Sequence, residues 1–210
     1  MGEFVVYIRI GDREYTFHKI TIEVIEKDIE NPFKHFNKKT IREIIDHRRY
    51  QSLKEHVQEY YPSILDKLAG EALFMLKEKG DNFYKQFLNN YGDLTYCQFV
   101  VKGNESILSK KGVYFIVMDN KLVFSGVCNN SFKLRFNQHI GNISPKCYFK
   151  DGTATHCHIN ARINENLPTA NIYFKVCPLE DVEEMKILKN SIVDRFEPEW
   201  NLRYGRSFNY

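Results

Sequence analysis

Residues Gly112–Cys128 read GVYFIVMDNKLVFSGVC and give the clearest indication of the fold. Val113–Met118 is a continuous apolar segment with the length of a buried strand, and Leu122–Val127 is the expected return strand. Asp119-Asn120 lies between them and is a two-residue connection of the kind that accepts positive φ angles. The stretch therefore predicts an antiparallel hairpin.

The chain after this hairpin alternates between helical, loop and strand patterns. Apolar residues at helical spacing predict a helix within Asn129–Ile140, and the following polar stretch predicts a loop. A short element within Thr155–Asn164 fits a helix or a strand. A strand is then expected over Asn171–Val176, followed by a helix from about Asp181 to Phe196 that Pro198 stops.

The chain before the hairpin predicts another hairpin, over about residues 3–23, with its turn at Gly11-Asp12. A helical region is expected over residues 39–90, with a new helix starting after Pro62, and then a strand over Leu94–Lys102. The predicted fold class is α/β (α+β), a small antiparallel sheet flanked by helices with an N-terminal strand-and-helix region. We divide it into residues 1–105, of unknown role, and residues 106–210.

Composition excludes several classes of protein. With 14% aromatic residues, the chain of 210 residues is too rich in large apolar side chains to be disordered. Its apolar runs are far shorter than the roughly 20 residues that cross a bilayer, so no membrane partner is expected. The start lacks the pattern of a signal peptide. Five cysteines without a CxxC pair indicate reduced thiols and a cytoplasmic location. A net charge of +3 permits nucleic-acid binding without indicating it.

Four short motifs follow one another along residues 110–203. Gly112-Val113-Tyr114 opens the first strand of the central hairpin, and Phe124-Ser125-Gly126 closes the second. Arg135 and His139 follow at a spacing of four, which places them on one helix face. The last helix ends at Pro198-Glu199-Trp200-Asn201. This set resembles the GIY-YIG nuclease family.

The resemblance implies a DNA endonuclease that hydrolyses a phosphodiester with one divalent ion, Mg²⁺ or Mn²⁺, acting on double-stranded DNA. Tyr114 would be a general base or would orient the attacking water. Arg135 would hold the scissile phosphate, and His139 would relay a proton or contact phosphate. Asn201 would tie the chain end back to the site. Lys146, in the loop after the helix, would contact the DNA backbone.

The sequence departs from the family pattern at three positions. The second tyrosine of the family falls on Phe124, so its hydroxyl is missing, and a frequent lysine falls on Val127. The metal-binding glutamate should lie nine residues before Pro198, where this chain has Lys189. A lysine ammonium only donates hydrogen bonds and does not ligate Mg²⁺, which takes hard oxygen ligands.

The Lys189 departure leaves three interpretations open. The chain is a naturally cleavage-defective relative, an inactivated variant of a working nuclease, or a protein in which Lys189 serves the phosphate directly. In functional terms, a nuclease competes with a DNA-binding module that does not cut and with a protein-interaction domain that keeps the fold. The oligomeric state is not indicated.

A separate group of metal-ligating residue types lies at Cys147 and at His156-Cys157-His158. Four such ligands could hold a structural zinc ion. The paired CxxC knuckle is absent, so surface histidines beside a loop are the favoured interpretation.

Overall fold

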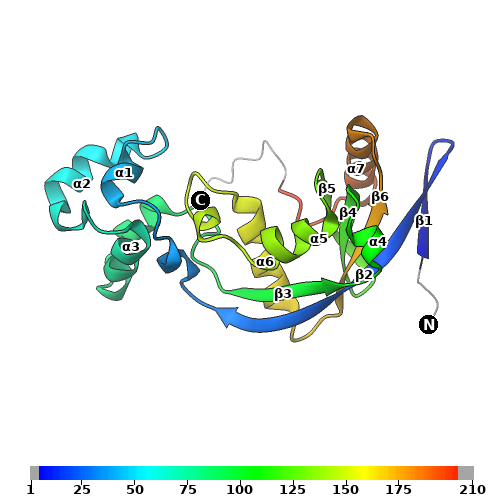
Figure 1. The fold of residues 1–210 in the computed structure, drawn as a ribbon, viewed down its shortest axis with the longest axis horizontal. Helices are drawn as coiled ribbons and strands as arrows, with labels where there is room; N and C mark the ends of the chain where they lie inside the picture. The colour runs from blue at the N-terminus through cyan, green and yellow to red at the C-terminus, as the bar shows by residue number, and fades with distance from the viewer. Residues whose placement is uncertain (1–4, 203–210) are drawn as a thin grey trace. The chain divides into compact units, whose positions relative to one another are not determined.

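The computed structural model describes residues 5–202 and shows a mixed α+β protein, which confirms the predicted fold class (Figure 1). The described strands are β1 (Val5–Ile10), β2 (Arg13–Ile29), β3 (Tyr96–Lys102), β4 (Gly112–Met118), β5 (Lys121–Cys128) and β6 (Ile172–Pro178). The described α-helices are α1 (Ile41–Ile45), α2 (Lys54–Tyr60), α3 (Ala69–Glu78), α4 (Glu105–Leu108), α5 (Phe132–Leu134), α6 (Ala154–Asn166) and α7 (Val182–Phe196).

Both predicted hairpins are present. The turn between β4 and β5 has Asp119 at φ 47° and Asn120 at φ 69°, so two short polar side chains occupy the left-handed region that this turn requires. β1 and β2 pair around Gly11, which has φ 60°. The predicted N-terminal hairpin is thus confirmed from Val5 onward, and its first two positions lie outside the described residues.

The six described strands form one sheet with the order β1-β2-β6-β4-β5, and β3 pairs with β2. β4 lies between β6 and β5 and is antiparallel to both, with Tyr114 opposite Val176 on one side and Gly126 on the other. Because directly opposed residues point to the same face, Tyr114 and its neighbours define one face of the sheet and Phe115 the other.

Each face of this sheet is covered differently. On the Tyr114 face, Phe136 stacks on Phe174 with ring centroids 4.2 Å apart. On the Phe115 face, α7 packs an apolar stripe of Met185, Leu188 and Ile192 against the strands. The alternation of β4 therefore buries side chains on both faces, which explains why its sequence reads as a continuous apolar run.

The contacts divide the described chain into two compact units. The first, here called the sheet unit, contains residues 5–25, 98–142 and 165–202. The second, the helical unit, contains residues 26–97 and 143–164. The two units alternate along the sequence, a partition that differs from the single boundary placed after residue 105.

The helical unit is built from short helices, as the spacing of apolar residues over 39–90 predicts. α1 begins at a capping box in which the Thr40 hydroxyl accepts from the Glu43 amide and the Glu43 carboxylate accepts from the Thr40 amide. Pro62 begins a 3₁₀ turn, Pro62–Ile64, and the next α-helix starts later, at Ala69. The Thr155–Asn164 segment, which fitted a helix or a strand, is the helix α6.

Two further findings bear on the predicted environment of the protein. Along residues 5–202, no helix is long and apolar enough to cross a membrane. All five cysteines are free thiols. The cytoplasmic location itself stays a prediction.

Candidate functional site

Tyr114 is held against β5 by the glycine opposite it. A Cβ atom added to Gly126 would lie 2.7 Å from Cζ of Tyr114 and 2.8 Å from its hydroxyl, so only a glycine lets the ring lie across the strand. The Phe124 ring, which lies on β5 like Gly126, is next to the Tyr114 ring, with ring centroids 5.9 Å apart. The Gly126 motif thus fixes where the Tyr114 hydroxyl lies.

The segment after β5 brings two basic residues to this face. The Ser131 hydroxyl caps α5 by accepting from the Leu134 amide, and α5 continues into a π-helix over Arg135–Ile140. Phe136 of the π-helix makes an edge contact with the Tyr114 ring, with centroids 5.2 Å apart. Because Phe136 is anchored there, the neighbouring Arg135 and His139 are carried to the Tyr114 face.

The positive charge of Arg135 acts on both other predicted site residues. Burial raises the pKa of Tyr114, and Arg135 opposes this rise only in part. The phenol therefore stays protonated at neutral pH and suits hydrogen bonding or the orientation of a water better than proton abstraction. Burial first, and then the Arg135 charge, lower the pKa of His139, so its imidazole is neutral near pH 7 and able to accept a proton.

Cys128 is a fourth member of this group, which the sequence reasoning treated only as a thiol for judging the redox compartment. It is fully buried and lies on the Tyr114 face, two residues beyond Gly126. Burial raises the pKa of Cys128, while the charge of Arg135 and a hydrogen bond from its side chain oppose the rise. The signal that could have found it is strand alternation, since residues 124, 126 and 128 share one face.

Asn201 fastens the chain end to β5. Its side-chain oxygen accepts from the Ser125 amide and its side-chain nitrogen donates to the Ser125 carbonyl, both at 2.8 Å. The Trp200 amide adds a bond to the Val123 carbonyl at 2.9 Å. These bonds cover the outer edge of β5, which β4 does not pair. Asn201 therefore acts on the Tyr114 face through the position of β5.

Lys189 lies on α7, the helix that packs on the opposite face of the sheet. It is half-buried, and its ammonium lies 3.3 Å from the side-chain oxygen of Asn190. Glu184, five residues earlier, is held by Arg13 at 2.5 Å and by the Tyr15 hydroxyl at 3.1 Å. Five residues are about 140° around a helix, so Glu184 does not replace a carboxylate at position 189.

Neighbouring carboxylates are also engaged, since Glu183 pairs with Lys186 at 2.6 Å and Glu199 with Lys121 at 2.9 Å. Within residues 5–202, no group of three or more His, Cys, Asp or Glu side chains could hold a metal ion. The residues at the expected position do not fit Mg²⁺ or Mn²⁺, and we derive no step through such an ion.

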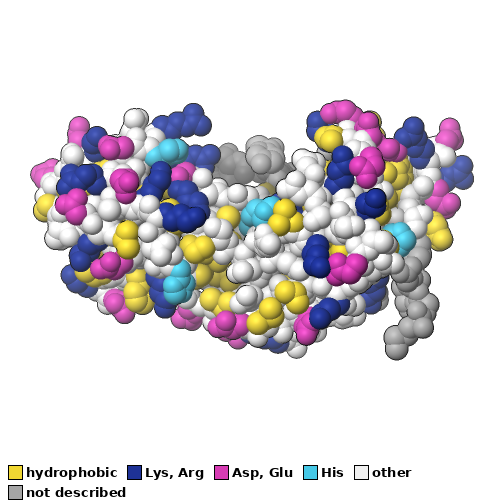
Figure 2. Space-filling model, in the orientation of Figure 1, with side chains coloured by type: hydrophobic (Ala, Val, Ile, Leu, Met, Phe, Trp, Pro, Cys, Tyr) yellow, Lys and Arg dark blue, Asp and Glu magenta, His cyan; other side chains and the backbone are white. Residues whose placement is uncertain are grey.

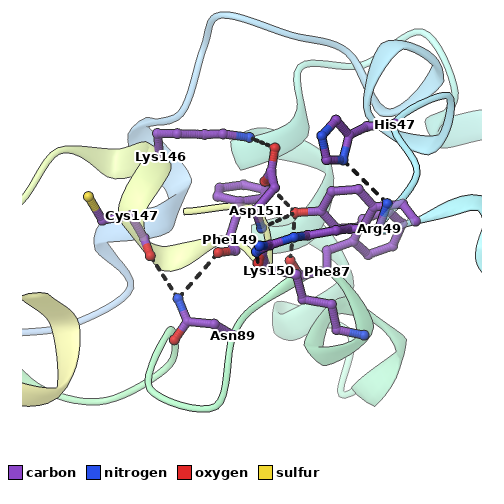
Figure 3. Close-up of polar contacts among 10 residues, drawn as sticks. His47, Arg49, Phe87, Asn89, Lys146, Cys147, Phe149, Lys150 and Asp151 are labelled. Atoms are coloured by element: carbon purple, nitrogen blue, oxygen red, sulfur yellow. Dashed lines mark hydrogen bonds and ion pairs between the residues drawn. The ribbon is translucent and has the colours of Figure 1, made fainter. Parts of the chain in front are cut away.

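Lys146 belongs to the helical unit, where it is part of a paired network (Figure 3). Its ammonium forms an ion pair with Asp151, and the Tyr50 hydroxyl donates to the same carboxylate at 2.6 Å. Burial would raise the pKa of Asp151, but the hydrogen bonds from Lys146 and Tyr50 outweigh burial and lower it. The predicted DNA-contacting lysine thus already has an internal carboxylate partner.

The loop that carries Lys146 is fastened at several points. The Asn89 side chain donates to the carbonyls of Cys147 at 2.7 Å and Phe149 at 3.3 Å, and Arg49 donates to the Lys150 carbonyl (Figure 3). These bonds join residues far apart in sequence, so they define the shape of the loop.

The Cys147–His158 group is arranged as part of the helical unit. His156 Nδ1 lies 3.8 Å from the Cys147 sulfur, and the Cys157 thiol donates to the Cys147 carbonyl at 3.3 Å. The His158 ring packs on Tyr91 with centroids 4.6 Å apart. Because α6 is a helix, His156 and His158 point in different directions, and the described residues here make no zinc site.

The structure therefore brings Tyr114, Arg135 and His139 together on one face, attaches Asn201 to the adjoining strand, and places Lys146 in the other unit. Comparison of the chain with protein-family models, with curated proteins and with solved structures gives no match.

Proposed function

We propose that the Tyr114 face binds the phosphodiester backbone of double-stranded DNA. The observation that carries the proposal is the position of Arg135 beside the protonated phenol of Tyr114 and the neutral imidazole of His139. A guanidinium offers a fork of donors that matches phosphate oxygens, and both neighbours are neutral groups able to exchange hydrogen bonds with a phosphate or a water. The resemblance to GIY-YIG nucleases supports the same assignment of roles.

The surface electrostatics favour a few defined contacts over a broad basic surface. The net charge is only +3, and in the view of Figure 2 the Lys and Arg side chains are intermixed with Asp and Glu. Non-specific binding of DNA depends on many neutralised phosphates. We therefore expect moderate affinity that depends strongly on Arg135.

Phosphodiester hydrolysis is a second candidate function, favoured by the grouping of His139 with Arg135 and Tyr114 on one face. A neutral imidazole near pH 7 can take a proton from a water, while the Tyr114 hydroxyl orients that water and Arg135 offsets the charge of the transition state. The nuclease resemblance assigns Mg²⁺ or Mn²⁺ to a glutamate where this chain has Lys189. We rank binding above cleavage for that reason.

Fluorescence anisotropy with a labelled duplex, over a series of salt concentrations, tests the binding proposal. Arg135→Gln is expected to weaken binding about 10- to 100-fold, because hydrogen bonds to charged groups contribute about 1.5–3 kcal/mol. The matched control is Lys133→Gln, which removes one positive charge from the same segment at an exposed lysine paired with Glu105. Equal weakening in both variants, or no salt-dependent binding by the parent chain, contradicts the proposal and favours a protein-interaction domain.

Cleavage of supercoiled plasmid with Mg²⁺ or Mn²⁺ separates the two candidate functions. The parent chain, Lys189→Glu and Tyr114→Phe are compared. Cutting by the parent that Tyr114→Phe abolishes would establish hydrolysis. Cutting by Lys189→Glu alone would show that Lys189 prevents cleavage in an otherwise intact site. DNA binding without cutting, in both the parent chain and Lys189→Glu, favours the DNA-binding module that does not cut.

A further inference from the structure

The Phe115 face of the sheet carries two lysines directly opposite each other. Lys19 of β2 pairs with Lys175 of β6 in the antiparallel ladder, and the next residue in the same row is Phe115 of β4. Side chains at such positions start only about 4.5–5.5 Å apart at Cβ, and like charges there destabilise a sheet. This placement therefore costs the folded protein free energy.

Both ammonium groups are gathered at one aromatic ring. The Lys19 ammonium lies 4.3 Å from the centroid of the Tyr173 ring, and the Lys175 ammonium lies 5.9 Å from it. Tyr173 is itself fixed, because it is buried and its hydroxyl donates to the side-chain oxygen of Asn120 at 3.3 Å. The attraction of each ammonium group to the ring face holds the two lysine side chains in a defined place.

Within residues 5–202, no carboxylate offsets this pair. Of the residues that the structure describes, none places an acidic oxygen within 4 Å of Lys19 or Lys175, whereas other lysines of the sheet unit are neutralised. Lys102 pairs with Glu23 and Lys121 with Glu199, each at 2.9 Å. Burial, and then the charge of Lys19, lower the pKa of Lys175. The pair is thus a concentrated positive charge without a counterion among the described residues.

We propose that Lys19 and Lys175 bind a phosphate group on the Phe115 face. A phosphate oxygen between the two ammonium groups removes their mutual repulsion, so binding gains free energy from both contacts and from that relief. The Tyr173 ring forms the floor of the site. The phosphate belongs either to a nucleic-acid backbone or to a free phosphate. The inference does not depend on the function assigned to the Tyr114 face, because it involves none of the same residues.

Thermal unfolding with inorganic phosphate, compared with chloride at equal ionic strength, tests this site. The measurement uses the Arg135→Gln chain, so that phosphate bound on the Tyr114 face does not contribute. Phosphate is expected to raise the midpoint of this chain and to have no effect after Lys19→Gln and Lys175→Gln are added. The matched control adds Lys121→Gln and Lys186→Gln, which remove the same charge from the sheet unit and should keep the phosphate effect. Lys19→Gln alone serves as a second variant if the double substitution fails to fold.

A second measurement identifies the source of the phosphate. Duplex binding is measured for the otherwise unsubstituted chain and for Lys19→Gln/Lys175→Gln over a range of salt. A decrease of about 1 in the salt slope assigns the site to the DNA backbone, since the two lysines share one phosphate and each phosphate contact contributes about 0.9. An unchanged slope with a lost phosphate effect assigns it to free phosphate. If inorganic phosphate fails to stabilise the Arg135→Gln chain, or stabilises it equally after Lys19→Gln and Lys175→Gln are added, the site does not exist.

Discussion

The polar cluster of the helical unit and that of the sheet unit place their charges in different ways. In the helical unit, Lys146 and Tyr50 both bond to one carboxylate, Asp151. In the sheet unit, the charge of Arg135 acts on Tyr114, Cys128 and His139, and none of these three residues carries a carboxylate. The cation of the first cluster pairs with a carboxylate, and the cation of the second acts on phenol, thiol and imidazole groups that can hydrogen-bond.

This difference distinguishes two uses of a partly buried cation. A lysine that already holds a carboxylate stabilises the fold, and it would have to break that pair to bind a ligand. Arg135 instead acts on a phenol and a thiol whose pKa values are raised by burial, and on an imidazole whose pKa is lowered. The comparison therefore indicates a structural role for the Lys146 network, while the ligand-binding role that we propose for the Tyr114 face stays a prediction.

The largest expected effect is the loss of stability from Asp151→Ala. It removes both the ion pair with Lys146 and the hydrogen bond from Tyr50, whose side chain is fully buried. Hydrogen bonds to charged groups contribute about 1.5–3 kcal/mol, so we expect a loss of about 2–3 kcal/mol in urea-induced unfolding. Affinity for duplex DNA, corrected for the folded fraction, should stay unchanged.

The matched control for this prediction is Asp66→Ala. Asp66 also bonds to a cation through both carboxylate oxygens, at 2.8 and 3.1 Å from Arg42, but that pair is exposed. Exposed pairs contribute little, so the control should unfold close to the parent. A selective loss of DNA binding after Asp151→Ala would place the Lys146 network in the functional surface and end the distinction between the clusters.

A smaller expected effect is that of Gly126→Ala, which alters the Tyr114 face without touching a charge. The added methyl group would lie 2.8 Å from the Tyr114 hydroxyl, so the ring must tilt away from its present position. Overpacking of this kind costs about 1–3 kcal/mol, and we expect the low end, because the far end of a side chain can move. The free energy of DNA binding should change by more than the free energy of unfolding does.

A double-mutant cycle with Tyr114→Phe checks the cause of that weakening. If Gly126→Ala acts through the Tyr114 hydroxyl, it adds little loss of DNA affinity to a chain that already lacks this hydroxyl. Additive losses would instead show that β5 itself has been disturbed, and Tyr114 would lose its place in the proposed site.

Local patterns in the sequence were sufficient for most elements of the fold, but not for the start of the helix after Pro62 or for the choice of a helix at Thr155–Asn164. The hairpin of β4 and β5 follows from two apolar runs around Asp119-Asn120, and the cluster of Arg135 and His139 follows from their spacing. The interleaving of the two units could not be predicted in this way, because it depends on contacts between distant segments, such as Asn160 with the backbone of Cys97. The Lys19–Lys175 pair was missed for the same reason, since strand register is set across the sheet.

The partner of Lys146 shows a further limit. A lysine in a polar loop near other basic residues has the same local pattern whether it contacts DNA or a carboxylate. Asp151 is only five residues away, but the pair forms because Tyr50, Asn89 and Arg49 shape the loop from a distance in sequence. The role of such a residue depends on the tertiary structure and not on its neighbours in the chain.

The smallest expected effect is a pH dependence of stability that originates at His139. Its folded-state pKa is lowered below its unfolded value near 6.5, so the unfolded chain binds the proton first as the pH falls. The stabilising contribution is complete above about pH 6.5 and is lost as the pH falls through the folded-state pKa. Unfolding in urea between pH 7.5 and 5 should therefore show a fall in stability that is smaller in His139→Gln.

Arg135→Gln makes the test specific to the Tyr114 face. It removes the second cause of the lowered pKa of His139 and keeps the first, which is burial. The slope of stability against pH should then lie between those of the parent chain and of His139→Gln. A slope equal to that of the parent would mean that the Arg135 charge does not reach the imidazole. The contrast with the paired Lys146 network would then rest on Tyr114 and Cys128 alone. In both, the Arg135 charge opposes the rise of the pKa that burial causes.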